Sequence, residues 1–233
     1  TSSIHLDENG NPTGLDQPTF KAEYCIVKKC TSKLVVTGKS DITEGGLGGG
    51  VYFASPDSTK AMQLENILID DCHADNGGGG LYTSRASGVI TNIDIKKCTT
   101  KKSGGGILIE RKSLSTTSTS INMISITLKN NVADVSGGGL CMKDGAKAIS
   151  KKTEFIGNHA KENGGAISMH KNTVLDLDDN KINTNTAKIQ GGAISLVSKA
   201  TMSITQTVLE SNEVLGWCDQ DLLDTNGKCI DPK

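Results

Sequence analysis

Two stretches of the chain, FIGNHAKENGGAISMH at residues 155–170 and INTNTAKIQGGAISLV at residues 182–197, align position by position at an offset of 27 residues. Each stretch begins with an apolar residue three positions before an Asn. Six residues after that Asn, a glycine run leads into a second apolar residue. Self-similarity at a fixed period of this length is typical of a solenoid, in which each repeat is one structural unit stacked on the next.

The first part of this repeat, an apolar residue followed three positions later by Cys or Asn, recurs along most of the chain. The spacings between successive copies are 42, 26, 33, 27, 27 and 27 residues. The longer spacings hold insertions, one before the glycine run at Gly48 and one at Ser113–Ser120, which indicate surface loops on a solenoid. The Cys or Asn positions are Cys30, Cys72, Cys98, Asn131, Asn158, Asn185 and Asn212. The preceding apolar residues are Val27, Ile69, Ile95, Leu128, Phe155, Ile182 and Leu209.

Within each repeat, apolar residues alternate with polar ones, as at Ile93 and Ile95 and again at Ile107 and Ile109. This period of two places the apolar side chains on one face of a β-strand. Connections between parallel strands are almost always right-handed. We therefore predict an all-β fold, a right-handed parallel β-helix of about seven coils with short terminal caps.

The composition agrees with a thin core and many tight corners, because the chain has 27 glycines among 233 residues and only 3% aromatic residues. Glycine adopts positive φ at little cost, and Asn tolerates the left-handed region at a bend. Stacked Asn side chains such as Asn158 and Asn185 can also hydrogen bond from coil to coil. Cys72 and Cys98 in the same column indicate a small, buried position.

We predict three segments along the chain. Residues 1–24 form an N-terminal cap or joint, residues 25–215 form the β-helix, and residues 216–233 form a C-terminal cap. Cys218 and Cys229 flank a polar turn in that cap, and we predict that they form a disulfide, the alternative being two unpaired thiols. The chain has neither a Met start nor a charged and then apolar leader, and we expect it to be a mature or excised piece of something longer.

Alternation turns Cys141 outward, because it follows the inward-facing Leu140. We predict that a locally shifted register buries it. The alternative is an exposed thiol that forms an interchain bond.

The FIGN motif at 155–158 and the GGAI motifs at 164–167 and 191–194 resemble the FxxN and GGAI repeats of bacterial polymorphic outer-membrane proteins. More broadly, residues 25–215 resemble right-handed parallel β-helices of the pectin-lyase-like superfamily. The first resemblance implies surface-displayed adhesion. The second implies the same fold, in a superfamily that also includes polysaccharide lyases and hydrolases.

The charge balance argues against some partners. The formal net charge is −1, from 25 Lys and Arg against 26 Asp and Glu, so neither nucleic acid nor an anionic membrane surface should attract the chain as a whole. No apolar run approaches the roughly 18–20 residues that span a bilayer, so we expect no membrane span in this segment.

No motif predicts a catalytic, cofactor-binding or metal-binding residue. His73 and His159 share a column three coils apart, too far to share a metal, and no Cys/His spacing indicates zinc. The signs at Lys28, Asp70 and Lys96 alternate between coils, which predicts a solvated strip of ion pairs. Three alternatives stay open: a polysaccharide-cleaving site at Asp70, Asp71 and Asp94 with Lys96; Ca²⁺ at Asp176, Asp178 and Asp179 rather than a solvated turn; and glycans or a partner on the Ser113–Ser120 insertion.

These observations favour an extracellular or cell-surface structural protein without enzymatic activity or cofactor. Open solenoid ends are unpaired sheet edges, and a head-to-tail contact that does not close on itself generates a filament. We therefore expect self-association of a β-helix building block into a filament or surface coat. The alternative is a cell-surface adhesin or carbohydrate-binding β-helix with glycans as partners, and a polysaccharide lyase or hydrolase has less support.

Overall fold

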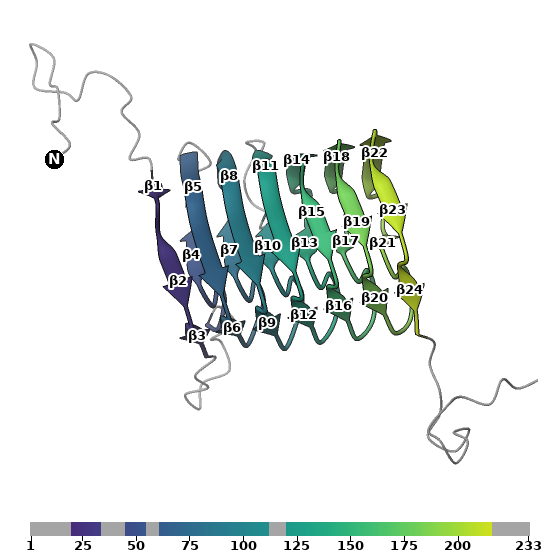
Figure 1. The fold of residues 1–233 in the computed structure, drawn as a ribbon, viewed down its shortest axis with the longest axis horizontal. Coiled ribbons are helices and arrows are strands. Elements are labelled where there is room, and N and C mark those ends of the chain that lie inside the picture. The colour runs from purple at the N-terminus through teal and green to yellow at the C-terminus, as the bar shows by residue number, and fades with distance from the viewer. Residues whose placement is uncertain (1–19, 34–44, 55–60, 112–119, 216–233) are drawn as a thin grey trace, which may run out of the picture.

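The computed structural model describes residues 20–33, 45–54, 61–111 and 120–215, which form one solenoid of parallel strands without helices (Figure 1). The all-β prediction is confirmed. Six turns contribute strands to all three of its sheets, and a seventh turn, from β22 to β24, contributes to two of them.

The three sheets run along the solenoid axis. Sheet 1 has 11 strands, sheet 2 has seven and sheet 3 has six. Sheet 1 contains β1 (Phe20–Glu23), β2 (Ile26–Lys28), β5 (Ala61–Asp70), β8 (Ser87–Lys96), β11 (Ser120–Lys129), β14 (Lys147–Lys151), β15 (Glu154–Ile156), β18 (Val174–Asp178), β19 (Lys181–Asn183), β22 (Thr201–Thr205) and β23 (Val208–Glu210). Sheet 2 contains β3 (Thr31–Ser32), β6 (His73–Ala74), β9 (Thr99–Thr100), β12 (Val132–Ala133), β16 (His159–Ala160), β20 (Thr186–Ala187) and β24 (Glu213–Val214). Sheet 3 contains β4 (Val51–Ala54), β7 (Leu81–Ser84), β10 (Ile107–Glu110), β13 (Leu140–Lys143), β17 (Ile167–Met169) and β21 (Ile194–Leu196).

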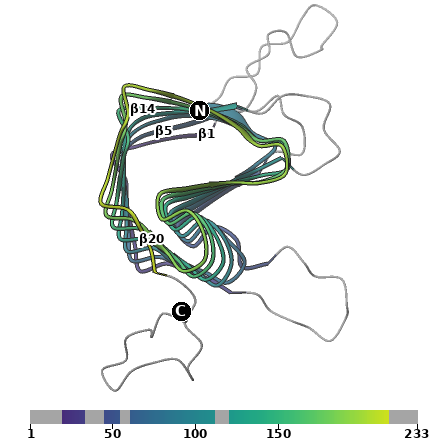
Figure 2. The same cartoon turned by 90° about the vertical axis from the view of Figure 1, so that its right-hand side faces the viewer.

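The register places each repeat residue beside its equivalent in the next turn. Val27 pairs with Ile69, Leu128 with Phe155, and the column continues to Leu209 through successive parallel pairings. Figure 2 looks along the axis from the C-terminal end. In that view the chain passes sheet 1, sheet 2 and sheet 3 counterclockwise as it approaches the viewer, which makes the solenoid right-handed.

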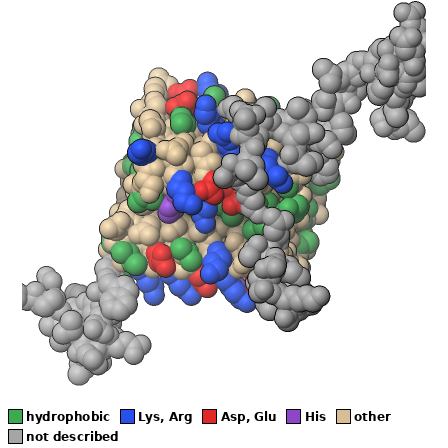
Figure 3. All heavy atoms as spheres, turned by 180° about the vertical axis from the view of Figure 1, so that it is seen from behind, with side chains coloured by type: hydrophobic (Ala, Val, Ile, Leu, Met, Phe, Trp, Pro, Cys, Tyr) green, Lys and Arg blue, Asp and Glu red, His purple; other side chains and the backbone are tan. Residues whose placement is uncertain are grey.

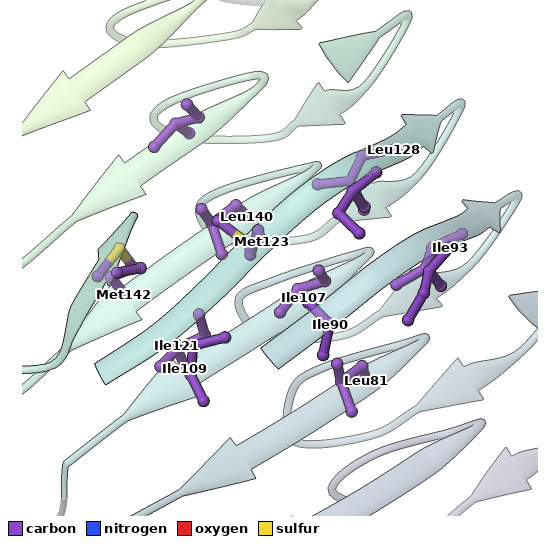
Figure 4. Close-up of a cluster of buried hydrophobic side chains, with 14 of the residues drawn as sticks. Leu81, Ile90, Ile93, Ile107, Ile109, Ile121, Met123, Leu128, Leu140 and Met142 are labelled. Carbon is purple, nitrogen blue, oxygen red and sulfur yellow. The ribbon is translucent and has the colours of Figure 1, made fainter. Parts of the chain in front are cut away.

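The core lies between the inner faces of the sheets. Ile93 and Leu128 from sheet 1 and Leu81, Ile107 and Leu140 from sheet 3 are all buried there (Figure 4). The columns that hold Leu128 and Leu140 are apolar in every described turn, so an apolar layer runs along the axis. This continuous layer explains why a single turn is not a folding unit.

The corners next to the ladder differ from the prediction for Asn. The residue with positive φ is the one before each Cys or Asn, such as Lys97 (φ 54°), Asn130 (φ 55°) and Thr184 (φ 54°). No ladder Asn of the described turns has positive φ. The reason is that the ladder side chain points inward to bond the next turn, so the bend falls on the exposed residue before it.

The glycine runs form another corner, as predicted. The first glycine takes the left-handed conformation, for example Gly137 with φ 68°. The second glycine faces the backbone of the next turn, because a Cβ on Gly138 would lie 2.5 Å from the carbonyl oxygen of Gly165. The third position is less restricted, since Ala166 occupies it in the following turn.

The first turn begins earlier than the predicted boundary at residue 24. Strand β1 (Phe20–Glu23) lies inside the segment expected to be a cap and pairs in parallel with residues 62–65 of β5. Ala22 packs against the core, as an inward-facing strand residue does. The solenoid therefore starts with residues that precede the Cys/Asn motif.

A substitution at the second glycine tests this packing. Gly138→Ala should lower the free energy of unfolding by about 3 kcal/mol, because the new methyl group meets the backbone of the next turn. Gly139→Ala is the matched control and should cost clearly less, since Ala is native at the equivalent position one turn later. Chemical denaturation of the full chain measures both, and equal losses would contradict the close approach at Gly138.

Candidate interaction surfaces

The Asn residues of the predicted ladder form a continuous column of hydrogen bonds. The Nδ2 of Asn131 donates to Oδ1 of Asn158 (3.0 Å), and the Nδ2 of Asn158 donates to Oδ1 of Asn185 (2.9 Å). The series ends at Asn212, whose Oδ1 accepts from Nδ2 of Asn185 at 2.9 Å. Each Oδ1 also accepts the backbone N–H of the ladder residue in the previous turn, as Asn158 does from Asn131 (3.1 Å). Asn131, Asn158 and Asn185 are fully buried, and each Nδ2 also donates to a backbone carbonyl of the preceding turn, as Asn158 does to Leu128 (2.8 Å).

Cysteines occupy the same column in the first three turns. Cys72 and Cys98 are buried, and the Sγ of Cys98 donates to the carbonyl of Lys96 (3.4 Å). Burial raises the pKa of Cys98 to about 12 and also raises the pKa of Cys72. These two thiols therefore remain protonated at neutral pH and are poor nucleophiles. The Cys and Asn segments join where the backbone N–H of Cys98 donates to Oδ1 of Asn131 (2.9 Å).

A second polar column was not predicted. Asn180 is buried at the bend within sheet 1, where its Oδ1 accepts from the backbone N–H of Thr153 (2.8 Å) and its Nδ2 donates to the carbonyl of Ser150 (2.9 Å). Its backbone N–H donates to Oγ1 of Thr207 (3.3 Å). The sequence could have revealed this column, because Thr153, Asn180 and Thr207 follow one another at the repeat spacing of 27 residues.

Cys141 is buried as predicted, but the expected register shift is wrong. Leu140 pairs with Ile167 and Cys141 with Ser168, so the register is regular and Cys141 faces the outer side of sheet 3. That side is covered by the glycine turn, because a Cβ on Gly137 would lie 2.9 Å from the Cβ of Cys141. Tyr82, Leu108 and Cys141 form a small second core there, and burial raises the pKa of Cys141 to about 11.

The charged residues next to the ladder are partly paired. Asp70 lies beside Lys28 in the first turn, with Nζ and Oδ2 3.8 Å apart, and beside Lys96 in the third turn by register. Asp94 is exposed. Its register partner is Leu68, which lies two positions before Asp70, so the two aspartates are not directly opposite each other. The structure therefore places Asp70 between lysines, as an ion-pair strip requires.

The residues of the predicted calcium-site alternative are not arranged as a metal site, although Asp176 and Asp178 lie on the same outer face of one strand. Asp176 and Asp178 lie on β18, Asp178 pairs with Lys151 (3.4 Å), and Asp179 has positive φ at the bend. Among the described residues, no group of three or more His, Cys, Asp or Glu side chains is arranged to hold a metal ion.

Each described histidine contacts a hydroxyl group. The Nδ1 of His73 lies 2.7 Å from Oγ1 of Thr99, and the Nδ1 of His159 lies 2.8 Å from Oγ1 of Thr186. His170 is half-buried, with Nε2 2.8 Å from Oγ of the buried Ser168. Burial is the main cause that lowers the pKa of His159 and His170, and nearby lysines lower both further.

A groove runs along the outer side of sheet 3, from the glycine turns to the corner that leads from the ends of its strands back to sheet 1. It consists of three adjoining hollows of about 530, 250 and 350 Å³. We call it the side groove. Figure 3 shows the back of the molecule, where Lys and Arg side chains lie among Asp and Glu side chains. The lining of the side groove includes Leu47, Asn76, Lys102, Ser103, Leu108, Glu110, Arg111, Val135, Ser136, Lys143, Asp144, Lys147, His170 and Lys171.

The two ends of the described solenoid expose apolar side chains. Eleven of the thirteen exposed large hydrophobic residues lie in the first turn or in the last two, and the middle turns contribute only Val89 and Ile124. The N-terminal group is Tyr24, Ile26 and Tyr52. The C-terminal group is Ile189, Leu196, Val197, Ile204, Val208, Leu209, Val214 and Leu215.

Some predictions fall outside the described residues. These are the Cys218–Cys229 disulfide, the C-terminal cap, His5 and the Ser113–Thr119 part of the insertion, whereas Ser120 begins β11. Cys25, Cys30, Cys72, Cys98 and Cys141 are not in disulfides within the described part of the chain. That part also contains no helix that could span a membrane.

Removing one Asn from the ladder should be costly. Asn158→Ala should lower the free energy of unfolding by roughly 2–4 kcal/mol, because it leaves buried donors and acceptors without partners. Asn212→Ala should cost less, since Asn212 is half-exposed at the end of the column and water can replace its bonds. Urea denaturation of the full chain compares the two variants. Similar losses for both would contradict a stabilising role for ladder continuity.

The histidine pKa shifts predict a pH-dependent stability. Folding lowers the pKa of these histidines, so the unfolded chain binds protons more readily than the folded chain. Protonation therefore begins to favour the unfolded chain as the pH approaches 6.5, the ordinary pKa of histidine. The free energy of unfolding should therefore fall as the pH drops from about 7.5 to about 5.5. The double variant His159→Gln/His170→Gln should flatten this dependence. An unchanged slope in that variant would show that other groups cause it.

The comparisons with known proteins agree with the repeat. Residues 152–169 match the Chlamydia polymorphic membrane protein repeat, which confirms the resemblance expected from the FIGN and GGAI motifs. Comparison with curated proteins and with solved structures gives no match. The parallel solenoid is compatible with the pectin-lyase-like superfamily. The repeat match suggests a cell-surface or outer-membrane location for this β-helix.

Proposed function

We propose that the chain is a structural β-helix of the cell surface or extracellular space whose copies associate head to tail into a filament or coat. The observation that carries this proposal is the concentration of exposed apolar residues at the two ends. Ile26 is 70% exposed in the first turn, and Val208 and Leu209 are 49% and 44% exposed in the last. Exposed apolar patches of this kind mark interaction surfaces.

The two ends also belong to the same columns. Strands β1 and β2 begin sheet 1 and β22 and β23 end it, and β3 and β24 are the corresponding end strands of sheet 2, so a second copy could continue the strands of these two sheets in register. In this arrangement Ile26 of one copy would lie beside Val208 of the next, and Val27 beside Leu209, because these residues occupy the same columns within one chain. The same step places Lys28 beside Glu210, with opposite charges. Open strand edges readily accept another strand, and this register also joins the two apolar cores.

The proposal gives the chain no catalytic role. The polysaccharide-cleaving alternative depends on Asp70, which has Lys28 as its ion-pair partner, and on Asp94, which is exposed on a regular strand. Residues 1–19 and 216–233 are not described, so the test uses the complete chain, in which those segments are present.

Charged residues at the ends should block assembly. Sedimentation velocity and electron microscopy of the wild-type chain should show rods that lengthen with concentration. Ile26→Asp/Val208→Asp should remain monomeric, because the new carboxylates face each other across the joint. The control Val89→Asp/Ile124→Asp changes equally apolar residues of the middle turns, which are 38% and 37% exposed, and should still assemble. A wild-type chain that stays monomeric at every concentration rules out the proposal.

A mixing experiment tests the head-to-tail geometry. Ile26→Asp alone blocks one end and Val208→Asp alone blocks the other, so each single variant should be monomeric. An equimolar mixture should form dimers and nothing larger, because each variant still has one intact end. Assembly of either single variant into long rods would contradict this joint.

A further inference from the structure

The ladder column ends on unused hydrogen-bond donors at the C-terminal end of the solenoid. The backbone N–H and the Nδ2 of each Asn donate to Oδ1 of the next turn, as those of Asn185 do to Asn212 (3.0 and 2.9 Å). Among the described residues, nothing accepts the backbone N–H of Asn212. Its Nδ2 donates one hydrogen to the carbonyl of Ile182 (2.9 Å), which leaves the other over. Asn212 therefore presents two donors to whatever stacks on this end.

The second polar column, in the bend of sheet 1, ends in the same way. The N–H of Thr153 donates to Oδ1 of Asn180 (2.8 Å), and the N–H of Asn180 donates to Oγ1 of Thr207 (3.3 Å). The N–H of Thr207 has no acceptor in the described part of the chain. Thr153 and Asn180 are buried in their own turns. A joint that continues the solenoid therefore also removes the N–H of Thr207 from water.

Head-to-tail association sets both of these ends against cysteine. The register of the joint places Cys25 of the next copy beside Thr207 and Cys30 beside Asn212, because these residues occupy the same columns within one chain. Each thiol donates to a carbonyl two residues earlier in its own chain. A thiol sulfur is a weak acceptor, whereas an amide or hydroxyl oxygen is a strong one. The donors thus lose water without gaining an equal partner.

The order of the ladder residues avoids this mismatch within the chain. The column changes from Cys98 to Asn131, where the N–H of the cysteine donates to the amide oxygen (2.9 Å). In the turns that the structure describes, a ladder Asn never precedes a Cys. Between cysteine turns, one backbone N–H meets one sulfur, as that of Cys72 does at the Cys98 thiol. At the joint, by contrast, the two donors of Asn212 share the single sulfur of Cys30.

From this mismatch we propose that Cys25 and Cys30 are specificity-determining residues of the head-to-tail joint. They weaken association between copies, and the C-terminal end prefers an incoming turn that carries oxygen acceptors at these two positions. The inference rests on the proposed function for the geometry of the joint. The apolar columns hold the copies together, and the polar columns determine how tightly.

Pairs of chains that can form only one joint test this role. Full-length Ile26→Asp keeps an intact C-terminal end, and Val208→Asp keeps an intact N-terminal end. Adding Cys30→Asn to the Val208→Asp chain should lower the dissociation constant of the mixed dimer by roughly tenfold or more, because both donors of Asn212 gain an amide oxygen. Sedimentation equilibrium measures the constant, and circular dichroism verifies that each variant is folded.

The matched control is Cys30→Leu, because Leu has nearly the shape of Asn but no acceptor. Equal tightening by Cys30→Leu and Cys30→Asn would overturn the proposal. Asn212→Ala in the partner chain removes the Nδ2 donor and should reduce the gain from Cys30→Asn, which completes a double-mutant cycle.

Cys25→Thr is an independent variant at a position that is exposed in the single chain. It should tighten the mixed dimer by roughly threefold to tenfold, because its hydroxyl can accept the N–H of Thr207, as Thr207 accepts that of Asn180. Dimers whose dissociation constant neither Cys30→Asn nor Cys25→Thr lowers would reject the role of the cysteines and leave the joint intact. The absence of dimers in every mixture would instead reject the joint, and this inference with it.

Discussion

The in-register stacking of parallel turns is the constraint on which the structure depends. Each backbone ladder fixes a residue beside its equivalent in the neighbouring turns, at the ~4.8 Å spacing of hydrogen-bonded strands. The hydrogen-bond partners and the space available to a side chain therefore depend on the equivalent residues in the neighbouring turns. The amide of Asn158 finds its partners in the core because Asn131, Asn185 and the carbonyl of Leu128 lie beside it in the neighbouring turns. The same rule forces glycine at Gly138, where the next turn leaves no space for a Cβ.

The columns change composition along the axis without breaking the ladder. The ladder column passes from Cys98 to Asn131, and the junction is satisfied because the Asn amide oxygen accepts the N–H of the cysteine. The bend in sheet 1 passes from Ile126 to Thr153 and Asn180, whose polar groups bond one another. Buried polar residues are thus present as runs of adjacent turns, since one alone would lack its partner. Apolar residues need no such continuity.

Much of this arrangement was predictable from the sequence, because residues that are one repeat apart in the sequence lie side by side in adjacent turns. The column from Val27 to Leu209 follows directly from the motif, and so do the strands around it.

The sequence could not reveal the second layer over sheet 3, since alternation describes one strand and not the turn that folds back over it. Cys141 was therefore expected to need a register shift. The bend at Asn130 was assigned to the neighbouring ladder Asn because Asn tolerates positive φ, whereas the ladder bonds exclude that conformation there. The column of Asn180 was missed because apolar residues occupy it in earlier turns. The side groove brings together Lys102 and Lys143 from positions that no sequence motif connects.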